Sequence, residues 1–96
     1  MIRSIADKAT QDIFDGVNSK ASRKLPQELH SKAYRLMDLI GSAGSINDLR
    51  VPPGNHLEAL KGNRKGFHSV RINDQWRIVF RWIDGDAEDV QVVDYH

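Results

Sequence analysis

The hydrophobic pattern of this chain changes its period near residue 67, and that change limits the folds open to it. Three later segments, 67–72, 76–83 and 87–93, alternate apolar and polar residues and are rich in β-branched and aromatic side chains. The segments are separated by Asn73-Asp74-Gln75 and Asp84-Gly85-Asp86, which are typical turn sequences. The second half of the chain is therefore predicted to form an antiparallel meander of three strands.

The first half of the chain carries helical patterns instead. The clearest predicted helix spans Pro26–Ile40, where apolar residues recur at helical spacing, and Gly41 is expected to end it. Lys32 and Arg35 on this helix are expected to be an ordinary solvated pair, because Glu28 is spaced to compensate their charge.

Shorter elements surround this helix. Asp7 is expected to cap a short helix that ends at Gly16, and Ser45 with Asp48 resembles the capping box of another. Residues 1–5 are predicted to form a short edge strand. The predicted fold class is α+β, with the N-terminal strand and the helices packed on one face of an antiparallel sheet.

Length and composition exclude several classes of protein. Ninety-six residues can bury one two-layer core, so a single domain over residues 1–96 is expected. The absence of cysteine excludes disulfides, thiolate metal sites and cysteine nucleophiles, and it favours a reducing compartment. The four histidines show no metal-binding spacing, so neither a metal nor a cofactor is expected. With no long apolar run and no targeting signal, the predicted location is the cytoplasm.

The charges nearly cancel overall, at 14 Lys+Arg against 13 Asp+Glu, but they are sorted along the chain. Residues 50–81 hold 7 basic and 2 acidic side chains, a net charge of +5, whereas residues 82–96 hold 5 acidic and no basic ones, a net charge of −5. The basic segment is therefore either neutralised by the acidic one or turned toward a polyanion such as RNA.

The register of the first predicted hairpin brings basic residues together. Keeping its apolar side chains on one face requires a three-residue turn that pairs Ile72 with Trp76, and Arg71 then lies opposite Arg77. Arg81 follows on the same face. Two guanidinium groups in facing positions are unfavourable unless an anion lies between them.

The second predicted hairpin turns on two residues, either Asp84-Gly85 or Gly85-Asp86. Both choices place Asp94 and His96 on the face that carries Arg77, away from the helices. This face is either a candidate site or an ordinary solvated surface, neutralised by the acidic last strand.

Several segments of the second half resemble HigB-type toxins of the RelE superfamily. The matching segments are residues 48–50, 52–55, 57–66, 68–73, 75–78 and the tripeptide Asp94-Tyr95-His96. The resemblance implies a RelE-like fold and cleavage of mRNA in the A site of the small ribosomal subunit. It also implies neutralisation by a HigA-type antitoxin that carries a helix-turn-helix domain.

The resemblance also implies which residues carry the reaction. The family's active residues correspond to Lys61, Arg77, Asp94, Tyr95 and His96, and further basic residues expected to bind RNA are Arg64, Lys65, Arg71 and Arg81. Cleavage through the 2′-OH needs a base, cations around the phosphorane and an acid for the leaving oxygen. His96 suits proton transfer and Asp94 its orientation, while Arg77 and Lys61 suit the phosphate and Tyr95 a base.

One position departs from the family pattern. Glu58 stands where some relatives have histidine; it could act as the base, although its charge would also repel a phosphate. His56 is a weaker substitute. Two other classes of function remain open: a non-catalytic toxin that docks on its target, as ParE-type toxins do, and a structural RNA-binding module.

Overall fold

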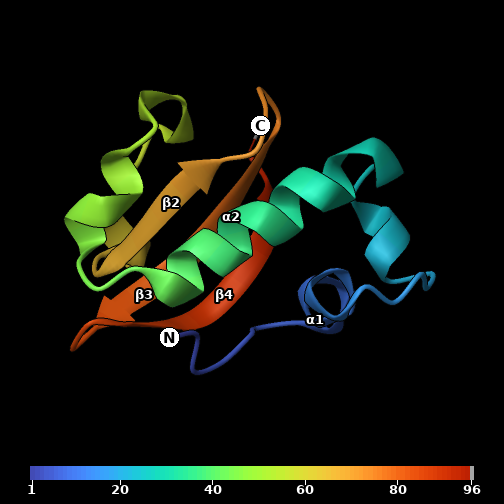
Figure 1. Ribbon diagram of the computed structural model, residues 1–96, viewed down its shortest axis with the longest axis horizontal. Helices are drawn as coiled ribbons and strands as arrows, with labels where there is room; N and C mark the ends of the chain where they lie inside the picture. The colour runs from blue at the N-terminus through green and yellow to red at the C-terminus, as the bar shows by residue number, and fades with distance from the viewer. Residues whose placement is uncertain (96) are drawn as a thin grey trace.

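A four-stranded antiparallel sheet forms one layer of the molecule, and helices cover one of its faces (Figure 1). The computed structural model describes residues 1–95. The strands run in the order β1-β2-β3-β4, and their bounds are Glu58–Ala59, Phe67–Arg71, Trp76–Ile83 and Asp86–Asp94. The long helix α2 (His30–Ser42) crosses the sheet, and the shorter helix α1 (Lys8–Asp15) lies beside β4. The predicted α+β architecture is confirmed.

Helix α1 begins and ends where the sequence predicts. The side chain of Asp7 accepts a hydrogen bond of 2.8 Å from the backbone N–H of Thr10, which caps the first turn. Gly16 ends the helix in the left-handed conformation, with φ 72°. The Thr10 hydroxyl in turn accepts from the backbone N–H of Val92, so this helix is tied to β4.

Helix α2 differs from its predicted bounds at both ends. Residues Gln27–Leu29 form a 3-10 turn, and the α-helix begins only at His30. Gly41 does not end the helix, which continues to Ser42 and stops because Ala43 is extended, with φ −68° and ψ 131°. Gly41 instead faces Ile2: a β-carbon at this position would lie 3.6 Å from the Ile2 side chain, which is an ordinary van der Waals contact.

The segment before α1 is not a regular strand, in contrast to the prediction. It meets the outer edge of β4 in two isolated parallel bridges, Ile2 with Ala87 and Ile5 with Val90. The backbone N–H of Arg3 donates to the Ala87 carbonyl at 2.8 Å. Both bridges are three residues apart on each chain, a spacing that breaks the two-residue alternation of a strand.

Two short 3-10 segments lead from α2 to the sheet. The predicted capping box of Ser45 and Asp48 is present at the start of Ile46–Arg50. A further turn, η4 (Pro53–Asn55), follows. The next strand, β1, was not predicted; it adds to β2 through Glu58 opposite Ser69.

The core lies between α2 and the inner face of the sheet. The β2–β3 hairpin has the predicted register, because Ile72 donates to the Trp76 carbonyl at 2.9 Å and Arg71 lies opposite Arg77. The inner face is apolar and buried, and α2 packs on it through Ala33, Leu36, Met37 and Ile40. The sheet residues of this core are Val70, Ile72, Trp76, Ile78, Phe80, Ala87, Val90 and Val92. No helix among residues 1–95 is both long enough and apolar enough to cross a membrane.

The second hairpin contains a β-bulge that changes the predicted face of the last strand. The turn is Asp84-Gly85, but the pairing shifts between Arg81 opposite Glu88 and Val79 opposite Gln91. Asp89 takes up the extra residue in a left-handed conformation, with φ 54°. The bulge is needed because Ala87, Val90 and Val92 all face the core. Side chains alternate between the faces of a regular strand, so an odd-numbered and an even-numbered residue share a face only if one extra residue lies between them.

The bulge makes one prediction wrong. Asp94 lies opposite Trp76, not on the face of Arg77, and Val93 lies opposite Arg77 instead.

Candidate active site

Arg77 is the centre of the candidate site, on the face of the sheet opposite α2. Its guanidinium is buried, with the residue only 8% exposed, and it is held on two sides. Nε donates to the Ser69 hydroxyl at 2.9 Å, and Nη2 donates to the His56 carbonyl at 2.5 Å. Nη1 lies 3.7 Å from a carboxylate oxygen of Glu58. The orientation of this guanidinium is therefore fixed before any ligand arrives.

Local backbone structure explains how the carbonyl of His56 reaches Arg77. His56 follows η4 in the left-handed conformation, with φ 45° and ψ 55°. The buried side chain of Asn55 donates to the carbonyls of Leu49 and Val51 at 3.2 and 3.3 Å, which anchors this turn. Because the turn is anchored, the His56 carbonyl is held toward the sheet.

Strand pairing supplies the other contacts of Arg77. Glu58 of β1 lies opposite Ser69 of β2, so their side chains meet Arg77 from the neighbouring strands. Sequence reasoning missed the role of Ser69. The sequence feature that could have indicated this role is the presence of a small polar residue on the predicted outer face of β2, two positions before Arg71. The His56 carbonyl had no such signal, because a backbone atom leaves none.

Tyr95 covers Arg77 from the far edge of the sheet. Its ring centroid lies 5.3 Å from the guanidinium carbon, a cation–π contact. The backbone N–H of Tyr95 donates to the Gln75 carbonyl at 2.7 Å, and the Gln75 side chain donates to Asp94 at 3.0 Å. The bulge in β4 thus brings Tyr95, instead of Asp94, to the face of Arg77.

A pocket of about 330 Å³ adjoins this contact. It is lined by Arg64, Val93, Asp94 and Tyr95, which places the predicted RNA-binding Arg64 beside two predicted catalytic residues. The pocket therefore combines a guanidinium, a carboxylate and a phenol in one place.

The other predicted site residues are more scattered. Lys61 and Lys65 are exposed at the two ends of the 3-10 turn Gly62–Arg64, and neither is among the hydrogen-bonding, ion-pair or ring partners of Arg77 within residues 1–95. Arg81 stacks on Phe67 at 5.1 Å, farther along β3. His96 lies outside the described residues, so its position stays a prediction.

The facing arginines avoid repulsion through separate acidic partners. Arg71 forms an ion pair with Asp74 of the turn, whereas Arg77 has Glu58. No anion between the two guanidinium groups is needed to explain their register.

The histidine of β2 does not belong to this site. His68 stacks on Phe80 with ring centroids 6.2 Å apart, on the inner side of the sheet. Burial and, to a smaller extent, the charge of Arg50 lower its pKa, which favours the neutral ring. Among residues 1–95, no three His, Asp or Glu side chains are grouped to hold a metal ion.

Sequence comparison places the chain among known toxins. Residues 3–96 match the family described as HigB-like toxin, the RelE-like toxin of the type II toxin-antitoxin system HigB. "Toxin HigB-1" of Vibrio cholerae is 36% identical over 87 residues, which cover 91% of this chain and 90% of that toxin. "Endoribonuclease HigB" of Proteus vulgaris is 31% identical over 97 residues, and each chain is covered completely.

Solved structures support the fold at lower sequence identity. A mutant of YafQ from E. coli superposes with a TM-score of 0.63 at 16% identity, covering 98% of this chain and 93% of its own. A chain of a heterotetrameric YoeB-YefM toxin-antitoxin complex from Staphylococcus aureus gives a TM-score of 0.62 at 19% identity, covering 100% of this chain and 98% of its own.

Proposed function

This chain belongs to the HigB-like family of RelE-like toxins of type II toxin-antitoxin systems, and we propose that it is an endoribonuclease that cleaves mRNA on the ribosome. An antitoxin is its partner by membership of that family. The activity is the one named for its relative from Proteus vulgaris. The cytoplasm is the matching location for such a target.

One observation supports the proposed chemistry: the guanidinium of Arg77 is buried and fixed by Ser69 and the His56 carbonyl, its Nη1 points to Glu58, and its face lies against the ring of Tyr95. A guanidinium held in this way can bind two phosphate oxygens and stabilise the charge of a phosphorane without reorganising first. A surface arginine that only neutralises an acidic strand has no need of such fixed partners.

The proposed reaction moves two protons. A base removes the proton of the 2′-OH, the 2′-oxygen attacks phosphorus, and the bond to the 5′-oxygen breaks as an acid protonates the leaving group. Glu58, at 3.7 Å from Arg77, is the proposed base, and His96 carries the second proton. The products are a 2′,3′-cyclic phosphate and a free 5′-OH. Since side chains supply base, acid and cation, the proposed cleavage needs no metal.

The remaining predicted residues have supporting roles in this proposal. Tyr95 lies on Arg77 and can stack on a base, and Arg64 with Lys61 and Lys65 adds positive charge near the pocket. Asp94 is assigned to orient His96. Arg71 and Arg81 flank the site along β2 and β3 and bind neighbouring phosphates.

The finer identity of the partners is also proposed. The antitoxin is a HigA-type protein with a helix-turn-helix domain, and the ribosome presents mRNA in the A site of its small subunit. If so, adding that antitoxin restores translation in an arrested extract. An arrest that the neighbouring antitoxin cannot relieve would argue against the assignment.

The decisive experiment adds purified protein to translating ribosomes and maps the new mRNA ends. The expected result is cleavage within codons at the A site, with cyclic phosphate ends, and no cleavage by Arg77→Gln. Arrest of growth without new mRNA ends would instead support a docking toxin of the ParE type. RNA binding without arrest would support a structural RNA-binding module.

A further inference from the structure

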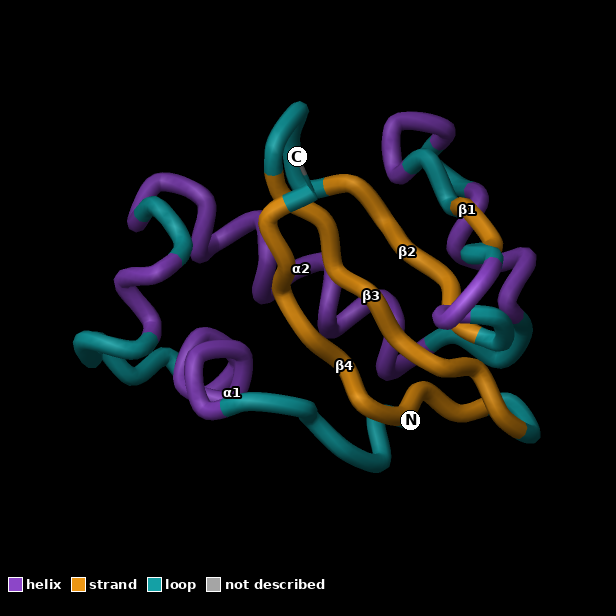
Figure 2. Tube along the Cα trace, turned by 180° about the vertical axis from the view of Figure 1, so that it is seen from behind, coloured by secondary structure: helices purple, strands orange, loops and turns teal. Residues whose placement is uncertain are grey.

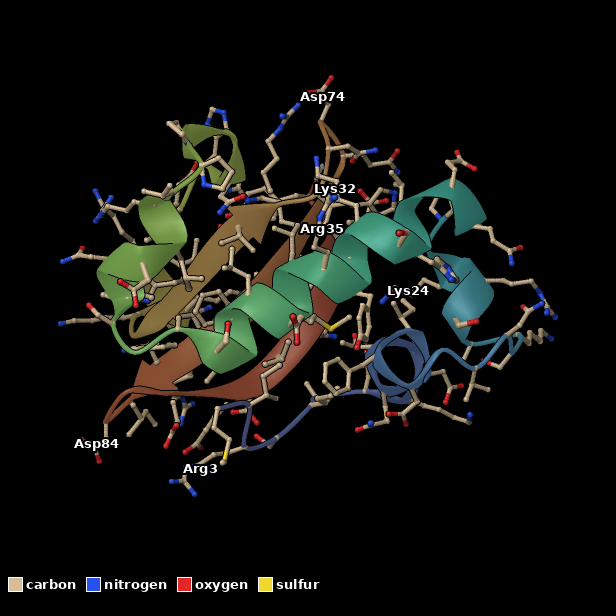
Figure 3. The ribbon with its side chains drawn as sticks, in the orientation of Figure 1. Arg3, Lys24, Lys32, Arg35, Asp74 and Asp84 are labelled. Carbon is tan, nitrogen blue, oxygen red and sulfur yellow. The ribbon has the colours of Figure 1, made fainter. Side chains whose placement is uncertain are left out.

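A groove of about 490 Å³ lies between α2 and η4, beside the end of β2. Its lining includes three cations, Lys32, Arg35 and Arg71, and one carboxylate, Asp38. Figure 3 shows Lys32 and Arg35 on the side of α2 that faces the hairpin with Asp74. The groove therefore carries a net positive charge.

The two cations from α2 are not neutralised within the described part of the chain. Neither Lys32 nor Arg35 forms an ion pair among residues 1–95, although Glu28 was expected to compensate both. Glu28 belongs to the 3-10 turn that precedes α2, so the helical spacing behind that expectation does not apply. Both cations are therefore available to an anionic ligand.

The third cation joins the groove to the candidate active site. Arg71 lines the groove and also lies opposite Arg77 in the β2–β3 pair, where facing Cα atoms are about 5 Å apart. Its present partner Asp74 has a side chain that is 96% exposed, and an ion pair so exposed is weak. A ligand phosphate can replace it at little cost.

The lining indicates which part of an RNA the groove would hold. Its apolar lining residues are Leu36, Leu39, Pro52 and Gly54, and no aromatic side chain among residues 1–95 lines it. Proteins that read single-stranded bases stack them on aromatic rings, whereas phosphates need only cations. The groove therefore suits the sugar-phosphate backbone, not the bases.

We propose that this groove binds backbone phosphates of the same RNA strand whose scissile phosphate lies at Arg77. The strand would pass from Arg77 on the outer face, around the end of β2 at Arg71, to Lys32 and Arg35 on the helix side of the sheet. This inference rests on the proposed RNA cleavage. It adds a second, sequence-independent contact to the site.

The test measures binding of fluorescein-labelled, 2′-O-methylated RNA by anisotropy at several salt concentrations. The 2′-O-methyl groups block cleavage, so binding is measured without chemistry. For a 10-nucleotide RNA, Lys32→Gln with Arg35→Gln should weaken binding about 10-fold, as expected of two surface ion pairs. The salt slope should fall by about 1.4, since each single-strand phosphate contact contributes about 0.7. A 3-nucleotide RNA, which covers only Arg77, should bind the variant as it binds the wild type.

The matched control is Lys20→Gln with Arg23→Gln, which removes the same charge from exposed residues that do not line the groove. Equal losses of RNA affinity in the two variants would show that only the net charge of the protein matters, and would overturn the proposal. Unchanged RNA binding with lost antitoxin neutralisation would also overturn it and make the groove a protein-docking surface. If wild-type protein binds the RNA through the groove but never cleaves mRNA on ribosomes, the proposed function fails while the groove contact stands.

Discussion

At the scale of single residues, the environment of Arg77 separates it from the other arginines of the outer face. Arg77 is buried and fixed by Ser69 and the His56 carbonyl, whereas Arg81 is exposed and only stacks on Phe67. A side chain that is already oriented contributes most to a transition state, because no entropy is lost when the charge develops.

We therefore expect Arg77→Ala to reduce ribosome-dependent cleavage about 10²- to 10³-fold, the usual effect of losing one transition-state contact. Arg81→Ala should reduce it much less. Single-turnover cleavage on programmed ribosomes measures both, and circular dichroism checks the fold. Equal mild losses would mean that the outer face is only a solvated surface.

His96 lies outside the described residues, and its role as a proton carrier is predicted from the sequence. Replacing it with alanine should lower cleavage about 10²- to 10⁴-fold, the share typical of general acid–base catalysis. Arginine at this position carries a positive charge but does not exchange protons near neutral pH, so His96→Arg should also be inactive. A His96→Ala protein that binds ribosomes and cleaves at the full rate would instead favour Glu58 with Lys61 as the catalytic pair.

At the scale of elements, the sequence predicted the pieces better than their alignment. Both hairpins, α1 and the capping box of Ser45 were predictable, because each depends on contacts between near neighbours. The start of α2, the added strand β1 and the bulge at Asp89 depend on contacts made only in the folded molecule. The candidate site inherits this limit: Arg77 was predictable, but Tyr95 as its neighbour was not.

The bulge in β4 yields a prediction about stability. Asp89 has a positive φ, which costs a β-branched residue about 1 to 2 kcal/mol and glycine almost nothing. Asp89→Val should therefore lower the free energy of unfolding by about that amount, while Asp89→Gly should leave it nearly unchanged. Urea denaturation followed by tryptophan fluorescence compares the two. A valine variant as stable as the glycine variant would show that the bulge can move.

The cap of α1 yields a prediction about pH. Burial alone would raise the pKa of Asp7. The pKa is nevertheless lowered, because the Asp7 carboxylate accepts hydrogen bonds from Thr10 and Gln91 and lies near the charge of Lys24. A carboxylate with a lowered pKa stabilises the fold above its ordinary value near 3.8, and this contribution is lost as the pH falls through the folded value.

Asp7→Ala should therefore cost about 0.5 to 2 kcal/mol at pH 7, as for other N-cap residues, and less near pH 3. Equilibrium unfolding at both pH values measures the difference. Asp15→Ala, at the other end of the same helix, is the control for loss of a carboxylate. A cost for Asp7→Ala that does not shrink in acid would exclude the charged cap as its origin.

At the scale of the whole molecule, small size limits how many nucleotides of an RNA the free protein can contact. Its principal extents are 32 × 27 × 25 Å, and the pocket beside Tyr95 measures about 330 Å³. A site so shallow contacts few nucleotides and must take the alignment of its substrate from elsewhere.

The free protein is therefore expected to be nearly inactive on naked mRNA and active on the same mRNA bound to translating ribosomes. Primer extension on both samples, at equal protein and RNA concentrations, makes the comparison. Efficient cleavage of the naked RNA would contradict dependence on the ribosome while leaving the endoribonuclease assignment intact.

The pairing of residues 1–5 with the edge of β4 also affects how the protein folds during its synthesis (Figure 2). Ile2 is synthesised long before its partner Ala87, and Ile5 long before Val90, so the growing chain carries an unclosed sheet through nearly all of its synthesis. Tyr95, which completes the surroundings of Arg77, is added later still. The surroundings of Arg77 are therefore completed only after nearly all of the described residues have been synthesised.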